Sequence, residues 1–236
     1  MILLAPDLSV LAAGVREGRR TFANILKYVR MGTSSNFGNM LSMALASIFL
    51  PFLPLLPLQI LLNNLLYDLS EVGIPFDEVD QEDVERPQSW DMRSILRFTI
   101  IMGATSSLFD AITFLALLKL FHSDASAFQT GWFIESIATQ ILVIFLIRSR
   151  HMPWRANRPH VMLITTSLGA LSVGIGLAIS PWGRFFHFET PPVGIMAIII
   201  VITAIYLLAA EIAKRLALRT HSARNERGNA AISEVD

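Results

Sequence analysis

Hydrophobic residues in this chain fall into long uninterrupted blocks, which short polar stretches separate. The blocks are about 18 residues or longer, which is the length that an α-helix needs to cross ~30 Å of hydrocarbon. The pattern therefore predicts an all-α membrane protein. Six transmembrane helices are expected, at residues 33–50, 55–74, 96–121, 131–147, 161–180 and 193–213.

The six segments differ in polarity and in length. The first two are the most polar, and Pro51-Phe52-Leu53-Pro54 between them is too short for anything but a tight hairpin. The fourth is short, whereas the third is long enough to tilt or to extend beyond the bilayer.

Lysine and arginine residues indicate the orientation. The chain has 19 lysine and arginine residues. All of them except Lys119 and Arg184 lie in four regions: before the first segment, after the last segment, and in or beside the second–third and fourth–fifth connections. Cytoplasmic loops of membrane proteins carry such an excess. Both termini are therefore expected in the cytoplasm, in a multi-pass protein of the cell inner (plasma) membrane.

Three polar stretches outside the membrane segments have their own predictions. Residues 12–30 predict a helix, which either runs on into the first membrane segment as a stalk or lies in the interface as an amphipathic helix. The acidic run at 77–91 is typical of a solvated surface. The tail from Thr220 is polar without periodicity, which indicates disorder.

Composition narrows the function. Charged residues make up 16% of the chain, against roughly 25% in soluble domains, and a net charge of zero gives no sign of nucleic acid. The absence of cysteine excludes disulfides and thiolate metal sites. There is no phosphate-binding loop, no metal-ligand spacing of histidines and no nucleophile elbow, so nothing in the chain indicates a catalytic centre.

Polar residues inside the second segment are the first candidates for function, because ionisable groups cost about 2.5–3.5 kcal/mol to insert into a membrane. Asn64, Asp68 and Glu71 are spaced i, i+4 and i+7, so they share one helix face. We expect Asp68 to lie on an ion pathway. For Glu71, an ion pathway and a position at the membrane interface are equally good interpretations.

The first segment supplies a matching polar face. Its polar residues are Ser35, Asn36, Asn39 and Ser42. A tight hairpin would bring the two faces together as a set of oxygen ligands with one or two carboxylates, which suits Mg²⁺. The alternative is that amides and hydroxyls only hold helices together. This alternative is favoured for Ser35, Asn36, Ser42 and Asn63, and an interhelical partner role is favoured for Asp110 and Glu135.

Several motifs resemble the P-type ATPases, and most closely the bacterial magnesium-importing group. Residues 14–25 are similar to the segment that leads from the phosphorylation domain into the stalk. Residues 34–40 and 56–68 resemble membrane helices five and six. Further similarity runs through 98–114 and 131–148 and weakens after about His151.

The resemblance implies an architecture and a site. The chain would comprise the end of the phosphorylation domain and a cytoplasmic stalk helix (1–31), six transmembrane helices equivalent to helices five to ten (32–215), and a cytoplasmic tail (216–236). Asp68 and Asn64 fall on the family's metal-ligand positions of the sixth helix, and Asn39 on a supporting one of the fifth. Tyr67 stands where calcium pumps have threonine, which favours Mg²⁺ as the transported ion.

The family's catalytic motifs are missing from the sequence. Neither Asp-Lys-Thr-Gly-Thr nor Gly-Asp-Gly-x-Asn-Asp occurs, so the resemblance implies a fragment that does not hydrolyse ATP alone, with ATP used only by the intact pump. Its partners would be the lipid bilayer, Mg²⁺ and a separately encoded N-terminal pump portion. The alternatives are a non-catalytic membrane module or remnant, or part of a pump for another cation. An independent carrier is disfavoured because the chain shows no internal repeat.

Overall fold

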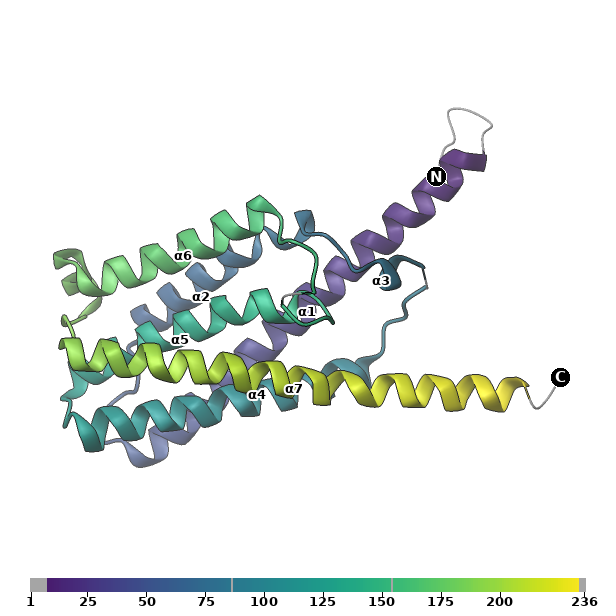
Figure 1. Cartoon of the computed structure of the whole chain (residues 1–236). Coiled ribbons are helices and arrows are strands. Elements are labelled where there is room, and N and C mark those ends of the chain that lie inside the picture. The colour runs from purple at the N-terminus through teal and green to yellow at the C-terminus, as the bar shows by residue number, and fades with distance from the viewer. Residues whose placement is uncertain (1–7, 86, 154, 234–236) are drawn as a thin grey trace.

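The computed structural model describes residues 8–85, 87–153 and 155–233, with side chains as far as Leu218. This part of the chain forms helices and no strand. Most of the helices run side by side in a bundle, from which the N-terminal half of α1 and the C-terminal part of α7 project at one end (Figure 1). Four helical segments are long and apolar enough to cross a membrane: Met92–Leu120, Ala125–Ile147, Val161–Ile179 and Val193–Leu218. They confirm the last four predicted segments, with changed limits.

Helix α1 (Leu8–Phe49) is unbroken for 42 residues. Its continuity agrees with the stalk alternative, in which the helix at 12–30 runs straight into the first membrane segment. Within the bundle α1 packs along α4, where glycines allow a close approach. A Cβ at Gly38 would lie 3.1 Å from Ser106 Cβ, and one at Gly103 only 2.6 Å from the Phe37 ring.

Helix α2 (Pro57–Glu71) is 15 residues long, shorter than the predicted 55–74. Pro57 occupies its first turn, where a missing N–H costs nothing, and Gln59 Oε1 accepts from Leu56 N. After Glu71 the chain turns into a short 3₁₀ helix, η1 (Ile74–Phe76), because Pro75 cannot continue an α-helix. A short helix α3 (Gln81–Glu85) follows.

Helices α4 (Met92–Leu115) and α5 (Ala125–Ile147) form the next pair. A π-helical turn at Ala116–Leu120 extends α4. The fourth predicted segment begins earlier than 131, because Asp124 caps α5 by accepting from Ala127 N. Helix α6 (Val161–Ile179), the 3₁₀ helix η3 (Pro181–Phe186) and α7 (Val193–Ser233) complete the chain.

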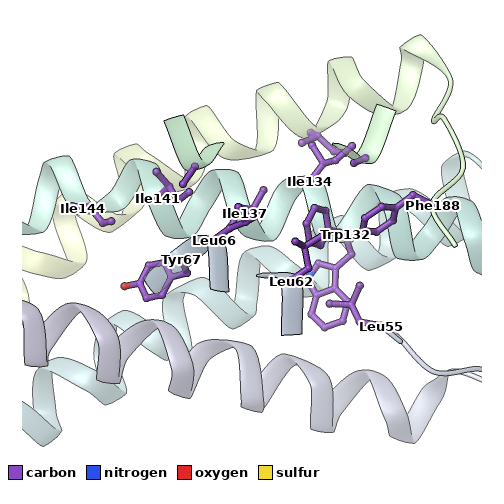
Figure 2. Packing of buried hydrophobic residues seen from close by; sticks show 14 of the residues in the cluster. Leu55, Leu62, Leu66, Tyr67, Trp132, Ile134, Ile137, Ile141, Ile144 and Phe188 are labelled. Carbon is purple, nitrogen blue, oxygen red and sulfur yellow. The ribbon is translucent and has the colours of Figure 1, made fainter. Parts of the chain in front are cut away.

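Helix α5 lies at the centre of the core. Figure 2 shows its isoleucines in a row with Trp132, facing side chains of α2 and Phe188. The row consists of Ile134, Ile137, Ile141 and Ile144. Helices α6 and α7, by contrast, expose many large apolar side chains on their outer faces, as lipid-facing helices do. The arrangement places the polar residues of α1 and α2 against a fixed central helix.

The C-terminal part differs from its prediction. Helix α7 continues to Ser233 (Figure 1), where the sequence predicted disorder from Thr220. Ala217 is still buried against the bundle, and the limit of the membrane domain at 215 stays a prediction. Alanine and arginine are frequent after Lys214 and no proline follows Pro192, which favours continuation of the helix.

Candidate cation site

An open cavity of about 570 Å³ lies between α1, α2 and α5. Asn39 of α1 and Asn64 of α2, two of the three predicted metal ligands, both line it. Asn36, Asn63 and Ser136 add further polar groups. The cavity gathers amide and hydroxyl oxygens, which Mg²⁺ accepts as ligands, and none of its described lining residues is a carboxylate.

Asn39 is held on the wall of this cavity by α5. Ser136 Oγ donates to Asn39 Oδ1 at 3.4 Å, and Gln140 Nε2 donates to Ser136 Oγ. The Asn39 carbonyl oxygen therefore already has a weak partner, which a bound cation would have to share or replace.

Asn63 is a further candidate metal ligand. The sequence analysis had favoured a role in helix packing for this residue. Its side chain is 3% exposed, and within the described residues its Oδ1 has no hydrogen-bond partner. Buried polar groups in native proteins are nearly always paired, so a free amide oxygen in a polar cavity favours a ligand. The sequence could not reveal this, since it does not show which of two adjacent asparagines points inward.

Asp68 does not line the asparagine cavity. It is exposed one turn beyond Asn64 and lines a second open cleft together with Glu71. The three predicted ligands are thus not brought into one closed site, and no group of three His, Cys, Asp or Glu residues in the described chain could hold a metal. Mg²⁺ needs only one or two carboxylates besides water.

The outer face of α2 combines these polar groups with exposed leucines. Asn64 and Asp68 are exposed beside Leu61, Leu65 and Leu69, each of which is about half exposed or more. If α2 crosses the membrane, as the sequence predicts, a carboxylate that faced lipid would be costly. This face would then require a cover of protein or water.

Asp110 joins three helices. Its carboxylate accepts from Ser42 Oγ of α1 and, at 2.9 Å, from Trp132 Nε1 of α5. The predicted interhelical role of Asp110 is thereby confirmed. Glu135 of α5 is equally buried and interacts with Asp110, which agrees with its predicted partner role.

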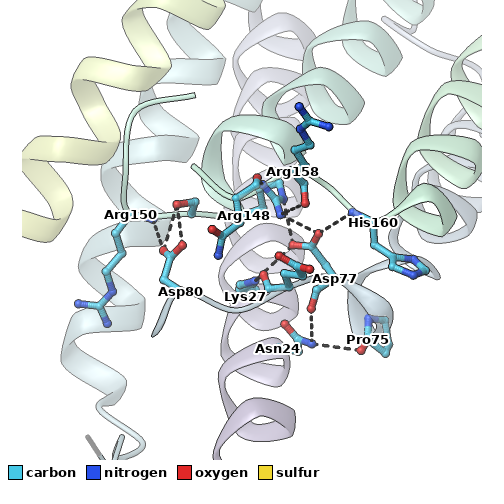
Figure 3. Close-up of polar contacts among 12 residues, drawn as sticks. Asn24, Lys27, Pro75, Asp77, Asp80, Arg148, Arg150, Arg158 and His160 are labelled. Atoms are coloured by element: carbon cyan, nitrogen blue, oxygen red, sulfur yellow. Dashed lines mark hydrogen bonds and ion pairs between the residues drawn. The ribbon is translucent and has the colours of Figure 1, made fainter. Parts of the chain in front are cut away.

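The acidic run after α2 is exposed at Glu78, Glu82 and Glu85, as predicted, but the prediction of a solvated surface is wrong for Asp77 and Asp80. Figure 3 shows Asp77 between Lys27 of α1, Arg148 at the end of α5 and the backbone of His160. The Asp77 carboxylate is 3.3 Å from Lys27 Nζ and accepts from His160 N at 3.2 Å. Asp80 is buried as well, and accepts from Ser149 Oγ and Arg150 N.

Burial also sets the electrostatics of this region. It lowers the pKa of Lys27 below its usual range, although the Asp77 carboxylate acts in the opposite direction. Burial raises the pKa of Asp83, and the neighbouring Arg150 opposes the change. Asp77, in the α2–α4 connection, is thus joined to Lys27 in the stalk part of α1 and to Arg148 at the start of the α5–α6 connection by buried ion pairs.

These features define a helical membrane protein with a polar, partly open cavity between three of its helices. Residues 52–216 match the family described as "Cation transporting ATPase, C-terminus", and the chain belongs to this family. The match confirms the resemblance to P-type ATPases that the motifs indicated.

The chain is also similar to several characterised proteins. It is 41% identical to "Magnesium-transporting ATPase, P-type 1" of Salmonella typhimurium strain LT2 and 42% identical to the protein of that name from Escherichia coli K12, in each case over 91% of this chain and 24% of the relative. A "Calcium-transporting ATPase" of Bacillus subtilis is 25% identical over 66% of the chain and 18% of the relative. The chain thus spans about a quarter of the length of the two magnesium-transporting relatives.

Proposed function

We propose that this chain is the membrane transport portion of a P-type ATPase that moves Mg²⁺, and that it carries part of the cation site. The observation that carries the proposal is the 41% identity to a magnesium-transporting ATPase over 91% of the chain. Lipid and Mg²⁺ are its partners, and Mg²⁺ is cargo rather than a resident cofactor.

Asp68 and Asn64 serve as the main ligands in this proposal, and Asn39 as a supporting one. The exposed polar face of α2 supports this ligand assignment, because polar groups in a membrane need protein or water against them. The relatives have about three quarters of their length outside the matched region, which could supply that protein. In the intact pump that remaining length would close the site and use ATP. A separately encoded N-terminal portion could provide it equally well.

The proposed topology has six membrane helices, as the sequence predicts. The second half of α1 and the 15-residue α2 span the membrane beside the four apolar helices, and residues 1–31 form the end of the phosphorylation domain and the stalk. Both termini lie in the cytoplasm of a multi-pass inner-membrane protein. Lysine and arginine are concentrated in the two terminal regions and in the connections expected on the same side of the membrane.

A chimera tests the proposal directly. The matched C-terminal quarter of the Salmonella relative is replaced by this chain, and the chimera is expressed in a strain that lacks its own magnesium transporters. We expect growth at limiting magnesium close to that given by the unmodified relative. A chimera that is present in the membrane in normal amount but gives no growth would contradict the proposed function, and growth restored only by another divalent cation would point to a different cargo.

A further inference from the structure

A second open cleft, of about 840 Å³, lies between the stalk part of α1 and the corner formed by α2 and η1. Its rear is rigid, because Asn24 of α1 donates to the backbone oxygens of Pro75 and Asp77 at 3.1 and 3.2 Å (Figure 3). The ring of His160 stacks on Phe76 at its edge, with 6.2 Å between the centroids. The cleft is thus part of the fixed structure.

The charge of the cleft is predominantly negative. Four carboxylates line it against a single arginine, Arg20. The carboxylates belong to Glu17, Asp68, Glu71 and Glu78. A low-dielectric wall with one sign of charge concentrates ions of the opposite sign, so the cleft attracts cations from solution.

Glu71 lies at the inner end of this cleft and carries the argument. Glu71 is 3% exposed, and within the described residues its Oε1 has no hydrogen bond of normal geometry, although the Tyr67 side chain interacts with the carboxylate. Its Oε2 lies against α1, 3.8 Å from the position that a Cβ of Gly32 would take. Glu71 is thus a buried carboxylate that lines an open cleft with one oxygen lacking a hydrogen-bond partner, and a cation bound beside it would stabilise its charged form.

Asp68 completes the pair. It stands one turn before Glu71 on α2, lines the same cleft and is close enough to Glu71 to repel it. Two neighbouring carboxylates favour a shared cation over two separate negative charges. Because Mg²⁺ binds through one or two carboxylates and retains several of its waters, an open, wet cleft suits it.

We propose that Glu71 and Asp68 bind a partly hydrated divalent cation at the inner end of this cleft. This would be an intermediate binding site between the asparagine cavity and the cytoplasm. This inference rests on the proposed transport function for its direction and its cargo. Asp68 in this cleft and Asn64 in the asparagine cavity lie one turn apart on α2, so the two sites follow one another along that helix.

The test uses the full chain in nanodiscs of zwitterionic lipid, with Mn²⁺ alone as the probe and Mg²⁺ as competitor. The sequence has no cysteine, so one nitroxide label can be attached at a chosen position. Bound Mn²⁺ should broaden the spectrum of a label at Ile25→Cys, on the cleft wall, and leave a label at Leu208→Cys, on the outer face of α7, unchanged. Mg²⁺ should reverse the broadening.

Glu71→Gln keeps the size of the side chain and removes its charge. It should weaken Mn²⁺ binding by at least about tenfold, whereas Glu71→Asp should retain most of the binding and show that the variants fold. Glu82→Gln, an exposed glutamate on α3 outside the cleft, serves as the matched control and should bind as the parent does.

Mn²⁺ binding that is unaffected by Glu71→Gln, or no broadening at Ile25→Cys in the parent, would overturn this site. Neither result bears on whether the chimera supports growth, so the transport proposal can survive it. Conversely, a chimera that fails to grow while its Glu71-dependent Mn²⁺ site is intact would count against the transport function and in favour of the site.

Discussion

Arg148, at the end of α5, binds both carboxylate oxygens of Asp77, with Nε 2.9 Å from Oδ2 and Nη2 2.8 Å from Oδ1. The side chains are 3% and 1% exposed. Paired in this two-point geometry, the charges tolerate burial. Removal of one partner would leave the other uncompensated in a place that water does not reach.

Asp77→Asn should therefore destabilise the protein strongly, by about 3–5 kcal/mol as for other broken buried pairs. The comparison is Asp83→Asn, which breaks the pair with Arg150, where the two side chains are 13% and 42% exposed. Because this pair is partly in water, its loss should cost less, toward the about 0–1 kcal/mol of exposed pairs. Thermal unfolding in detergent compares the two variants, and equal shifts would show that the Asp77 pair is not a structural anchor.

Lys27 predicts a dependence of stability on pH. Burial lowers the pKa of Lys27, so between this lowered value and the ordinary one the unfolded chain holds a proton that the folded chain has released. Stability should then rise with pH across this alkaline window, because the unfolded state binds more protons. Below the lowered pKa the penalty for a buried charge is fully present.

Lys27→Met should flatten this dependence, since it removes the titrating group and leaves Arg148 to neutralise Asp77. Lys119→Met, at an exposed helix end, is the matched control and should keep the parent's slope. Denaturation midpoints across the alkaline range provide the measurement. An unchanged slope in Lys27→Met would mean that another group is responsible.

The apolar helices were predictable because their signal is local. Helix α6 begins at the predicted residue 161 and ends one residue earlier than predicted, at Ile179, since an uninterrupted apolar run needs no distant partner to be recognised. The first turns of α5 were missed because they contain Gln129 and Thr130. Those residues bond to Leu53 O and Glu189 N, far away in the sequence.

The site was predictable only in part, for the same reason. Helical spacing correctly placed Asn39 and Asn64 on surfaces that share a cavity. It could not show that Asp68 lies in a different cleft, or that Asn63 points inward with a free oxygen. In the acidic run, a charge pattern typical of solvated loops concealed Asp77 and Asp80, whose partners come from residues about 70 positions away.

Reporter fusions can test the proposed orientation. The excess of lysine and arginine predicts that the α5–α6 connection lies in the cytoplasm. A fusion after Arg155 should give a cytoplasmic signal, and one near His187 an external signal. Reversed signals, or the same signal at both positions, would contradict the six-span topology.

Catalysis by the chain alone is not expected. Because the sequence lacks the phosphorylated Asp-Lys-Thr-Gly-Thr motif of P-type ATPases, the purified 236-residue chain should form no phosphoenzyme and show no magnesium-stimulated ATP hydrolysis. Incubation with labelled ATP followed by acid precipitation is the measurement. An acid-stable, hydroxylamine-sensitive phosphate on this polypeptide would refute the expectation.

The proposed ligands can be ranked in the growth-supporting chimera. Asp68→Asn keeps the shape of the side chain and removes its charge, so it should weaken cation binding while insertion into the membrane stays normal or improves slightly. Asn64→Leu removes an oxygen ligand but no charge, so its effect on growth at limiting magnesium should be smaller. Asn63→Leu tests the inward-facing amide in the same way.

Asp110→Asn separates ion binding from helix packing. Its carboxylate already accepts from Ser42 and Trp132, so this variant should lower the amount of folded protein more than the apparent affinity for magnesium. Growth across a magnesium series, measured beside membrane expression, distinguishes the two effects.

If Asp68→Asn is expressed normally and supports growth at limiting magnesium as well as the parent does, then Asp68 is not an essential ligand and the central assignment of the site fails.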